Sequence, residues 1–153
     1  PDLRGYGDSD KPAGDEAHIR YSKRRMALDM AQVMTALGHE RFSVAGHDRG
    51  ARVTHRLLRD HEARVVRASV MDIVPTLDIY EATDRTIATS YFHWFFLIQD
   101  DGLPERLIAG DPGYLLDWAL NRLCVDPAAI GAAEREEYKR WFVLPETIHR
   151  PGP

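Results

Sequence analysis

The sequence predicts an α/β fold, in which a parallel sheet is followed along the chain by a block of helices. Two apolar runs have the length and composition of strands: Phe42–Ala45, expected to be buried, and Val65–Met71. Helical patterns over Tyr21–Leu37 and Ala51–His61 come before the first run and between the two. This helix–strand–helix–strand order is typical of parallel strands joined by crossover helices. From about residue 76 to 150 the pattern is helical only, which predicts a separate helical block.

The predicted division of the chain follows this change of pattern. Residues 1–75 are assigned to part of a sheet-containing core, and residues 76–153 to a helical cap, or lid, inserted after a sheet strand. The chain begins inside a glycine-rich loop, Pro1–Pro12, and ends at Arg150–Pro153. We therefore expect a piece of a longer protein, in which the core is partial and the cap incomplete.

Composition restricts the functional classes. The 153 residues are 44% hydrophobic and 29% charged, which fits a soluble globular domain. A net charge of −4 with interspersed signs favours neither nucleic acid nor an anionic membrane as a partner. The single Cys124 excludes an internal disulfide, and no apolar stretch reaches the roughly 18 residues of a membrane span. Because the N-terminus shows no signal-peptide pattern, a cytoplasmic location is the default expectation.

The helix predicted over Tyr21–Leu37 has clear end signals. Ser22 can cap its start, and Gly38 follows its last turn. One face carries apolar residues at helical spacing, which indicates core packing rather than a pliable methionine-rich binding surface. These residues are Met26, Met30, Val33, Met34 and Leu37.

Similar signals define helices further along the chain. The helix after the first strand has an apolar face of Val53, Leu57 and Leu58 and a solvent face of Arg56, Arg59 and Asp60. In the helical block, proline-containing caps and apolar spacing predict three more helices. One begins at Asp111-Pro112 and runs through Leu123, one begins at Asp126-Pro127, and the last covers Ala132–Phe142.

Five residues, Gly46-His47-Asp48-Arg49-Gly50, lie where the first strand meets the next helix. A strand that turns sharply into a helix, with small residues two before and two after the apex, is the nucleophile elbow of α/β-hydrolases. Glycines are needed there because the apex is strained and the helix must pack close to the strand. The apex is Asp48, and a carboxylate placed there can attack a carbon atom and form an ester with the enzyme. These five residues alone leave an ordinary tight turn open as the alternative.

Two arginines follow this carboxylate. Arg49 is the next residue, and Arg52 comes one helical turn on and on a neighbouring face. Both belong to the first turn of the helix, where free N–H groups and the helix dipole favour an anion. Two guanidinium groups there would bind the carboxylate of a small acid substrate and keep Asp48 ionised. The alternative is that both arginines are solvated surface residues.

An aromatic cluster at residues 91–96 contains a second candidate pair, His93 and Trp94. Their N–H groups are donors on otherwise apolar walls, and such donors suit a halide ion as it leaves the substrate. Successive helical residues point about 100° apart, so both reach one pocket only at a helix end or a distortion. The alternative is an aromatic core of the helical block that contains one satisfied histidine.

Asp72 follows the second strand and is the third candidate. Its carboxylate is placed to orient a catalytic histidine, because the chemistry of a parallel sheet gathers at the C-terminal ends of its strands. A helix cap or turn residue is the alternative. His47 lies in the elbow and is expected to be structural rather than a base. The remaining histidines show no metal-ligand spacing: His18, His39, His55, His61 and His149.

Four segments together carry a resemblance that extends along nearly the whole chain. They are Asp2-Leu-Arg-Gly-Tyr-Gly-Asp-Ser, Gly46-His-Asp-Arg-Gly-Ala-Arg-Val, Met71-Asp-Ile-Val-Pro-Thr and Tyr91-Phe-His-Trp-Phe-Phe. In this order they resemble the haloacetate (fluoroacetate) dehalogenases of the α/β-hydrolase fold. The implied fold class is α/β, an α/β-hydrolase parallel sheet, present in part, with an inserted all-helical cap.

The resemblance also implies a role for each site residue. The assigned residues are Asp48 as the nucleophile, Asp72 as the triad acid, Arg49 and Arg52 for the substrate carboxylate, and His93 and Trp94 for the halide. The family's catalytic histidine and its third halide donor, a lid tyrosine, are expected beyond residue 153. The implied activity is hydrolytic dehalogenation of a small 2-haloacid such as fluoroacetate or chloroacetate. The implied partners are that haloacid and water, with a homodimer as an open assembly state, and neither a cofactor nor a metal is required.

Two other functions stay open on the sequence. An epoxide hydrolase of the same fold shares the aspartate elbow, but such enzymes usually carry Trp after the nucleophile and use lid tyrosines to protonate the epoxide. Arg49 and Arg52 disfavour its neutral substrate. The third reading, from a different class, is a non-catalytic fragment, because the expected catalytic histidine lies outside these residues.

Overall fold

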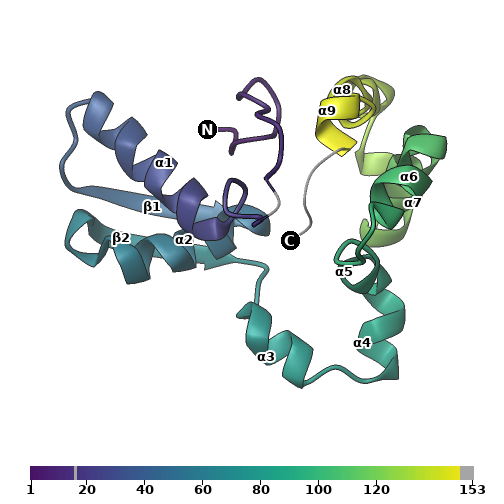
Figure 1. The fold of residues 1–153 in the computed structure, drawn as a ribbon, viewed down its shortest axis with the longest axis horizontal. Helices are drawn as coiled ribbons and strands as arrows, with labels where there is room; N and C mark the ends of the chain where they lie inside the picture. The colour runs from purple at the N-terminus through teal and green to yellow at the C-terminus, as the bar shows by residue number, and fades with distance from the viewer. Residues whose placement is uncertain (16, 149–153) are drawn as a thin grey trace. The chain divides into compact units, whose positions relative to one another are not determined.

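A parallel pair of strands lies beside two helices in the first half of the chain (Figure 1). The structure, a computed structural model, describes residues 1–15 and 17–148. The sequence predictions on His149 and Arg150–Pro153 therefore lie outside the described residues. Within the described ranges, no helix has both the length and the apolar composition needed to cross a membrane.

The chain divides into two units. We call Ala17–Phe92 the sheet unit, because it contains both strands. The second unit combines Pro1–Glu16 with His93–Pro153, and we call it the helical unit. The core–cap boundary expected at residue 75 remains a prediction about the whole protein.

The two strands confirm the predicted parallel pair. β1 (Phe42–His47) pairs with β2 (Val65–Met71), and the last residues of the two strands are register partners. β2 has the predicted bounds, whereas β1 continues two residues beyond Ala45 to the turn. Both strands therefore end at the same edge of the sheet, and Asp48 and Asp72 follow at that edge.

The first strand is less buried than predicted. Phe42 and Gly46 are buried, but Ser43 and Ala45 are exposed. On β2, Val70 is exposed by 50%. The physical reason is that each strand has one strand neighbour among the described residues, so much of the sheet surface has nothing packed against it.

Helix α1 (Lys23–Ala36) has the predicted end signals. The Ser22 side chain accepts a hydrogen bond from the backbone N–H of Arg25, and Gly38 has a φ of 81°. The predicted apolar face is wrong in part, because Val33 and Leu37 are exposed. Met26 of the predicted face is buried, as are Ala27 and Ala31, which the prediction did not include. Alanines let a neighbouring helix approach closely, so the contact face is set by small residues rather than by the larger apolar ones.

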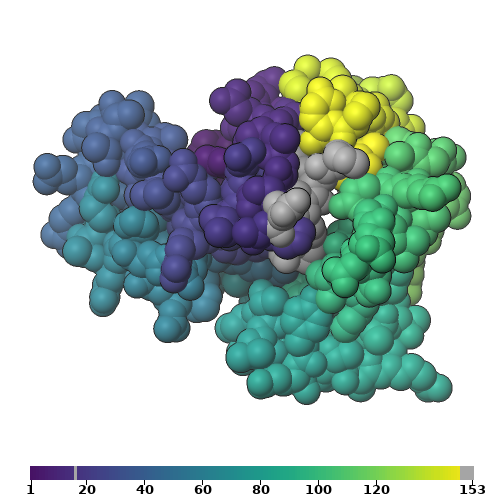
Figure 2. Space-filling model, viewed as in Figure 1, coloured from purple at the N-terminus to yellow at the C-terminus, as the bar shows by residue number. Residues whose placement is uncertain are grey.

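That neighbour is α2 (Arg49–Asp60), which packs against α1 and against both strands. It begins two residues before the predicted start at Ala51. Its buried residues include the predicted Val53 and Leu57, while Leu58 is only half-buried. Figure 2 shows the surface atoms of this part of the sheet unit, coloured blue to teal.

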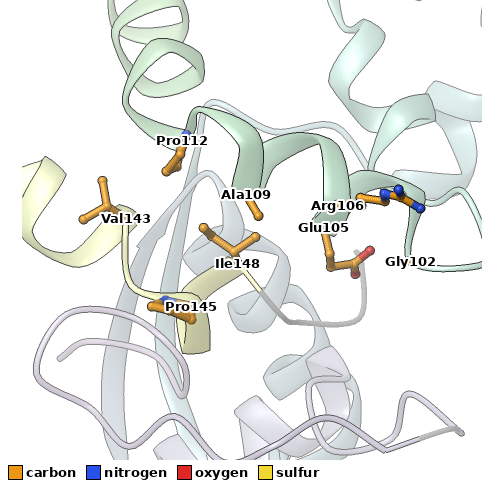
Figure 3. Close-up of a pocket in the computed structure, with 8 residues that line it drawn as sticks. All are labelled: Gly102, Glu105, Arg106, Ala109, Pro112, Val143, Pro145 and Ile148. Carbon is orange, nitrogen blue, oxygen red and sulfur yellow. The ribbon is translucent and has the colours of Figure 1, made fainter.

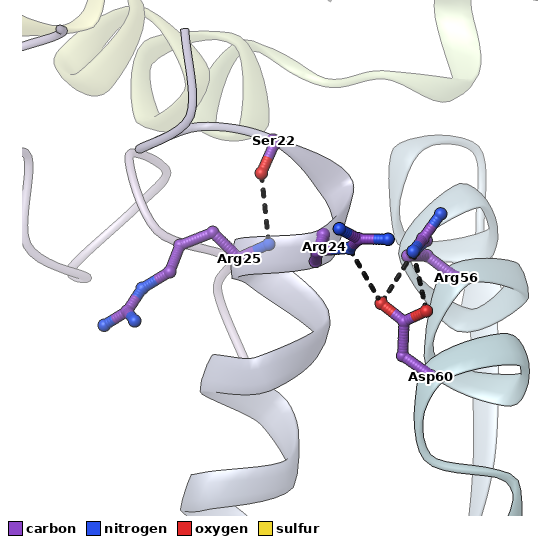
Figure 4. Close-up of polar contacts among 5 residues, drawn as sticks. All are labelled: Ser22, Arg24, Arg25, Arg56 and Asp60. Atoms are coloured by element: carbon purple, nitrogen blue, oxygen red, sulfur yellow. Dashed lines mark hydrogen bonds and ion pairs between the residues drawn. The ribbon is translucent and has the colours of Figure 1, made fainter. Parts of the chain in front are cut away.

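A charged cluster ties α1 to α2 on the solvent side (Figure 4). The Asp60 carboxylate accepts from Arg56 at 2.6 and 2.8 Å and from the Arg24 Nε at 3.2 Å. Of the predicted solvent face, Arg59 and Asp60 are exposed and Arg56 is half-buried. The ion pairs hold one carboxylate between two guanidinium groups, which lowers the pKa of Asp60 chiefly through its hydrogen bonds to Arg56.

The remaining described helices are short, with two exceptions. They are η1 (Glu62–Arg64), α3 (Thr76–Glu81), α4 (Arg85–Ser90), α5 (Phe92–Phe96), α6 (Leu103–Gly110), α7 (Pro112–Leu123), η2 (Pro127–Ala129), α8 (Ala132–Phe142) and α9 (Pro145–Ile148). Asp111 caps α7 by accepting from the N–H of Tyr114, and α8 has the predicted bounds. The helix predicted from Asp126-Pro127 is wrong, because a single 3₁₀ turn forms there before Gly131.

Candidate active site

The turn between β1 and α2 has the backbone of a strained elbow. β1 ends at His47, α2 begins at Arg49, and Asp48 lies between them at φ 46° and ψ −117°. A non-glycine residue rarely adopts a positive φ, because its Cβ then crowds the backbone. The N–H of Asp48 donates to the carbonyl oxygen of Met71 at 3.2 Å, which joins the apex to the end of β2. The strain predicted at the apex is therefore present.

The two glycines of the elbow differ in what an added side chain would meet. A Cβ on Gly46 would lie 2.4 Å from the carbonyl oxygen of Gly50 and 2.6 Å from the Thr54 Oγ1, so close packing of α2 on β1 requires a glycine there. A Cβ on Gly50 would meet nothing within 4 Å among the described atoms. The expectation that both glycines allow the close approach of α2 to β1 is therefore wrong for Gly50. The carbonyl group of Gly50 faces Gly46, but a side chain at position 50 would meet no other described atom.

This difference gives a stability prediction. Gly46→Ala in the whole protein should lower the free energy of unfolding by about 1–3 kcal/mol, because the new methyl overlaps rigid backbone. Gly50→Ala is the matched control, and it should be neutral or stabilise by up to about 1 kcal/mol, because alanine favours helix. Urea unfolding of both variants measures the difference. Equal midpoints for the two variants would contradict the close contact.

Positive charge surrounds Asp48. Arg49 and Arg52 are both half-buried. Burial is the main cause that lowers the pKa of the Arg52 guanidinium; Asp48 and Tyr80 raise it and Arg49 lowers it further. Because Asp48 and Arg49 both affect the pKa of Arg52, both lie within electrostatic reach of its guanidinium. Arg56, one helical turn further along α2, pairs with Asp60 on the solvent side.

Lys23 belongs to the same group of charges, although the sequence did not single it out. Burial, then Arg49 and Arg52, lower the pKa of its ammonium group to about 8, while Asp48 raises it. Lys23 is 25 residues before the apex, so no motif joins them. Only the packing of α1 against α2 brings Lys23 within electrostatic reach of the elbow, and no pattern in the sequence could have found it.

The elbow also presents backbone donors. Arg49 and Gly50 are the first two residues of α2, where N–H groups have no partner within the helix. Among the described residues, neither N–H donates a hydrogen bond to another backbone group. Free N–H groups next to the apex are the arrangement that stabilises a negatively charged oxygen.

Asp72 lies at the neighbouring strand end and also has a positive φ, 57°. Its Oδ2 lies 3.5 Å from the Nε2 of His47, and both side chains are largely exposed. This contact between the two strand ends was not predicted. The predicted roles of Asp72 in orienting a base and of His47 as a structural residue remain predictions.

His93 and Trp94 lie on α5 and are half-buried. α5 is a five-residue helix, so both residues are near a helix end. Two successive helical residues can reach one pocket only at such an end or at a distortion. They belong to the helical unit, whereas Asp48 belongs to the sheet unit. Their assignment to the halide therefore remains a prediction.

The helical unit has a pocket of its own, of about 360 Å³ (Figure 3). Its walls come from α6, the start of α7 and α9, and the side chains of Ala109 and Ile148 point toward one another in it. It is lined by Gly102, Glu105, Arg106, Ala109, Pro112, Val143, Pro145 and Ile148. None of the predicted site residues lines this pocket. Across the described residues, no three His, Cys, Asp or Glu side chains gather in a way that could hold a metal ion.

Comparison with known proteins identifies the architecture. The protein-family model described as alpha/beta hydrolase fold matches residues 1–107. A crystal structure from Nostoc sp PCC 7120, of a protein described as a candidate alpha/beta hydrolase, superposes with a TM-score of 0.93 at 51% identity. That match covers 98% of this chain and 52% of the other.

The chain is also similar to two curated enzymes. A fluoroacetate dehalogenase from Burkholderia sp is 43% identical over 97% of this chain and 49% of its own length. A soluble epoxide hydrolase from Corynebacterium sp. (strain C12) is 31% identical over 97% of this chain and 51% of its own length. The chain thus spans about half the length of the curated relatives it matches.

Proposed function

Since the chain belongs to the alpha/beta hydrolase fold family and is similar to haloacetate dehalogenases, we propose that the whole protein hydrolyses the carbon–halogen bond of a small 2-haloacid such as chloroacetate or fluoroacetate. One observation carries this proposal: a carboxylate at a strained elbow lies among half-buried positive groups. A neutral substrate gains nothing from that charge, whereas a small organic anion does. The identity of 43% to the fluoroacetate dehalogenase from Burkholderia, against 31% to the epoxide hydrolase from Corynebacterium, supports the same choice.

In the proposed first step, Arg49 and Arg52 hold the substrate carboxylate by charge-assisted hydrogen bonds. Asp48 then attacks the α-carbon in line with the carbon–halogen bond. The new carbon–oxygen bond forms an ester on Asp48, and the bonding electron pair leaves with the halide. His93 and Trp94 are proposed to donate hydrogen bonds to that halide. Donors that strengthen as charge develops on fluoride would lower the barrier for this poor leaving group.

In the proposed second step, water hydrolyses the ester. Asp72 orients a histidine that removes the proton from the water, and the oxygen of that water attacks the ester carbonyl. The free N–H of Arg49 lies next to Asp48 and is proposed to stabilise the oxyanion that forms. Release of the 2-hydroxyacid restores the Asp48 carboxylate. We expect the histidine from the part of the protein beyond residue 153, as the family resemblance implies.

Because His47 lies beside Asp72, the expectation that the catalytic histidine lies beyond residue 153 can be tested against His47. His47→Gln should keep halide release from chloroacetate within about threefold of the wild-type rate, since an exposed structural residue tolerates such a change. Asp72→Asn should instead stop after one equivalent of halide, because the ester forms but is not hydrolysed. Halide release in a single turnover and the mass of the protein measure both outcomes. A His47→Gln protein that stops after one equivalent would make His47 the base.

The second candidate function is an epoxide hydrolase, which the 31% identity to the Corynebacterium enzyme favours. An aspartate elbow would serve that reaction equally well, because the same nucleophile can open an epoxide. The two activities separate in one assay: halide from fluoroacetate or chloroacetate against diol from styrene oxide. Diol formation without halide release would replace the proposed function. If neither product forms and chloroacetate leaves no ester adduct on the protein, the third reading, a non-catalytic protein, stands.

A further inference from the structure

The N-terminal loop contacts α8 within the helical unit. The sequence assigns Pro1–Pro12 to the core, yet the structure groups this loop with the helices that follow Phe92. The Nζ of Lys11 lies over the Trp141 ring of α8, 4.6 Å from its centroid. An ammonium group at this distance is attracted by the negative face of an indole ring. The contact therefore attaches the loop to α8.

Lys11 is held in place by its own loop. Its ammonium group donates hydrogen bonds to the carbonyl oxygens of Gly7 and Ser9, the latter at 3.2 Å, and the residue is half-buried. The loop also closes on itself, because Asp2 accepts from the N–H of Asp8 at 3.1 Å and from the Ser9 hydroxyl at 2.8 Å. The charge beside Trp141 therefore has a fixed position.

Trp141 is held in a similar way on α8. Its Nε1 donates to the Glu137 Oε1 at 3.1 Å, and Arg140 binds the same carboxylate at 2.5 and 2.9 Å. The hydrogen bonds from Arg140, followed by that from Trp141, lower the pKa of Glu137, which stays ionised at neutral pH. The guanidinium carbon of Arg140 also lies 4.0 Å from the ring centroid, so two cations lie beside one indole.

Helix α8 is in turn joined to α7. The Asp117 carboxylate of α7 pairs with Lys139 at 3.1 Å and with Arg135 at 3.7 Å, and both of these cations belong to α8. Because these pairs join the two longest helices of the helical unit, we expect α7 and α8 to move together. The same unit contains α5, which carries the predicted halide donors His93 and Trp94.

The loop gives the helical unit a second connection to the sheet unit along the chain. One connection is direct, because the chain passes from Phe92 into His93. The other starts at Lys11, six residues before Ala17, which is the first residue of the sheet unit. Six residues of extended chain span about 20 Å at most. While Lys11 is held on Trp141, this short segment limits how far α8 can move from Ala17.

We propose that Lys11 and Trp141 form a latch that holds the helical unit, and with it the halide donors, in place during cleavage of the carbon–halogen bond. The inference rests on the proposed function, which assigns the halide to His93 and Trp94 and the attack to Asp48. Lys11 and Trp141 are positioning residues, because they act through the helices. Loss of the latch lets the donors shift, which slows cleavage most for fluoride, the poorer leaving group.

The test measures halide release in a single turnover by the whole protein, with fluoroacetate and chloroacetate as substrates. Lys11→Met removes the charge and keeps the length of the side chain, and it should slow fluoride release about tenfold and chloride release about twofold. Trp141→Leu should do the same, and the double variant should be no slower than either single one, because both remove one contact. Trp141→Phe keeps an aromatic face and should stay within about threefold of the wild type.

Arg122→Met is the matched control, because it removes an exposed cation from α7 of the same unit. It should leave both rates of halide release unchanged. Hydrogen exchange supplies a measurement that does not depend on activity. Lys11→Met should speed amide exchange in Pro1–Pro12 and in α8, and should leave exchange in α1 and α2 as it is in the wild type.

The outcomes separate the latch from the proposed function. Unchanged exchange in Lys11→Met overturns the latch, whatever the activity. Faster exchange with equal effects on the two acids makes the contact purely structural and overturns its positioning role. If the wild type releases halide from neither acid, the proposed function is overturned and the positioning role with it, while exchange still tests the attachment of the loop to α8.

Two further cases keep the test decisive. For a wild type that releases chloride but no fluoride, chloroacetate and bromoacetate give the same comparison, with chloride as the poorer leaving group. Should Trp141→Leu fail to fold, Lys11→Met and Trp141→Phe still decide the question.

Discussion

Replacing Asp48 by Asn should abolish halide release from chloroacetate, with a loss of at least about 1,000-fold in kcat. The amide is close in size to the carboxylate, so the strained turn and the packing of α2 on β1 should be kept. It carries no negative charge and is a poor nucleophile toward the α-carbon. The measurement is the initial rate of halide release by the whole protein, together with its mass after incubation with chloroacetate.

The matched control is Asp78→Asn, which changes an exposed carboxylate on α3 of the same unit. This variant should release halide at the wild-type rate. Wild type stopped during turnover should carry an ester adduct, and Asp48→Asn should carry none. Halide release that survives the loss of the Asp48 carboxylate would remove that residue as the nucleophile and leave the fold assignment untouched.

Replacing Arg52 by Gln should raise the KM for chloroacetate about 100-fold, with a smaller change in kcat. The substrate carboxylate then loses charge-assisted hydrogen bonds, and each such bond contributes about 1.5–3 kcal/mol when a charged group takes part. Neutral chloroacetamide should lose far less, because it makes no ion pair with a guanidinium. The ratio of kcat/KM for chloroacetate to that for chloroacetamide therefore isolates the contribution of charge.

Arg56→Gln is the control for this experiment. Arg56 lies one helical turn beyond Arg52 and binds Asp60 on the solvent side (Figure 4). Its loss should cost stability of about 1 kcal/mol or less and leave both kinetic parameters unchanged. If the two variants show the same substrate preference, the proposed carboxylate site at Arg49 and Arg52 fails, and a neutral substrate becomes the better choice.

Several elements of the fold followed from local signals in the sequence. β2 and α8 have the predicted bounds, and α7 begins at the predicted Asp111 cap. Strand composition, helical spacing and capping act over a few residues, so the sequence expresses them directly. The helix predicted after Asp126 failed for a local reason too, because Gly131 and Ile130 interrupt the pattern after one turn.

The buried faces could not be read in the same way. Val33 and Leu37 satisfy the helical spacing of α1 but are exposed, whereas Ala27 and Ala31 are buried. Spacing identifies a set of apolar positions, and the neighbouring helix decides which of them it covers. The exposure of β2 has the same origin, because a strand residue is buried only where another surface packs against it.

The sequence by itself determined the elbow of this protein: an acidic apex between two glycines, the strand and helix on either side, and two arginines in the first helical turn. These features depend on residues close together in the chain, whose steric and capping preferences act locally. The tertiary structure alone decided that Lys23 lies within electrostatic reach of the elbow and that His47 lies beside Asp72. Both pairings involve residues far apart in sequence, and they exist only because packing of helices and pairing of strands bring distant segments together.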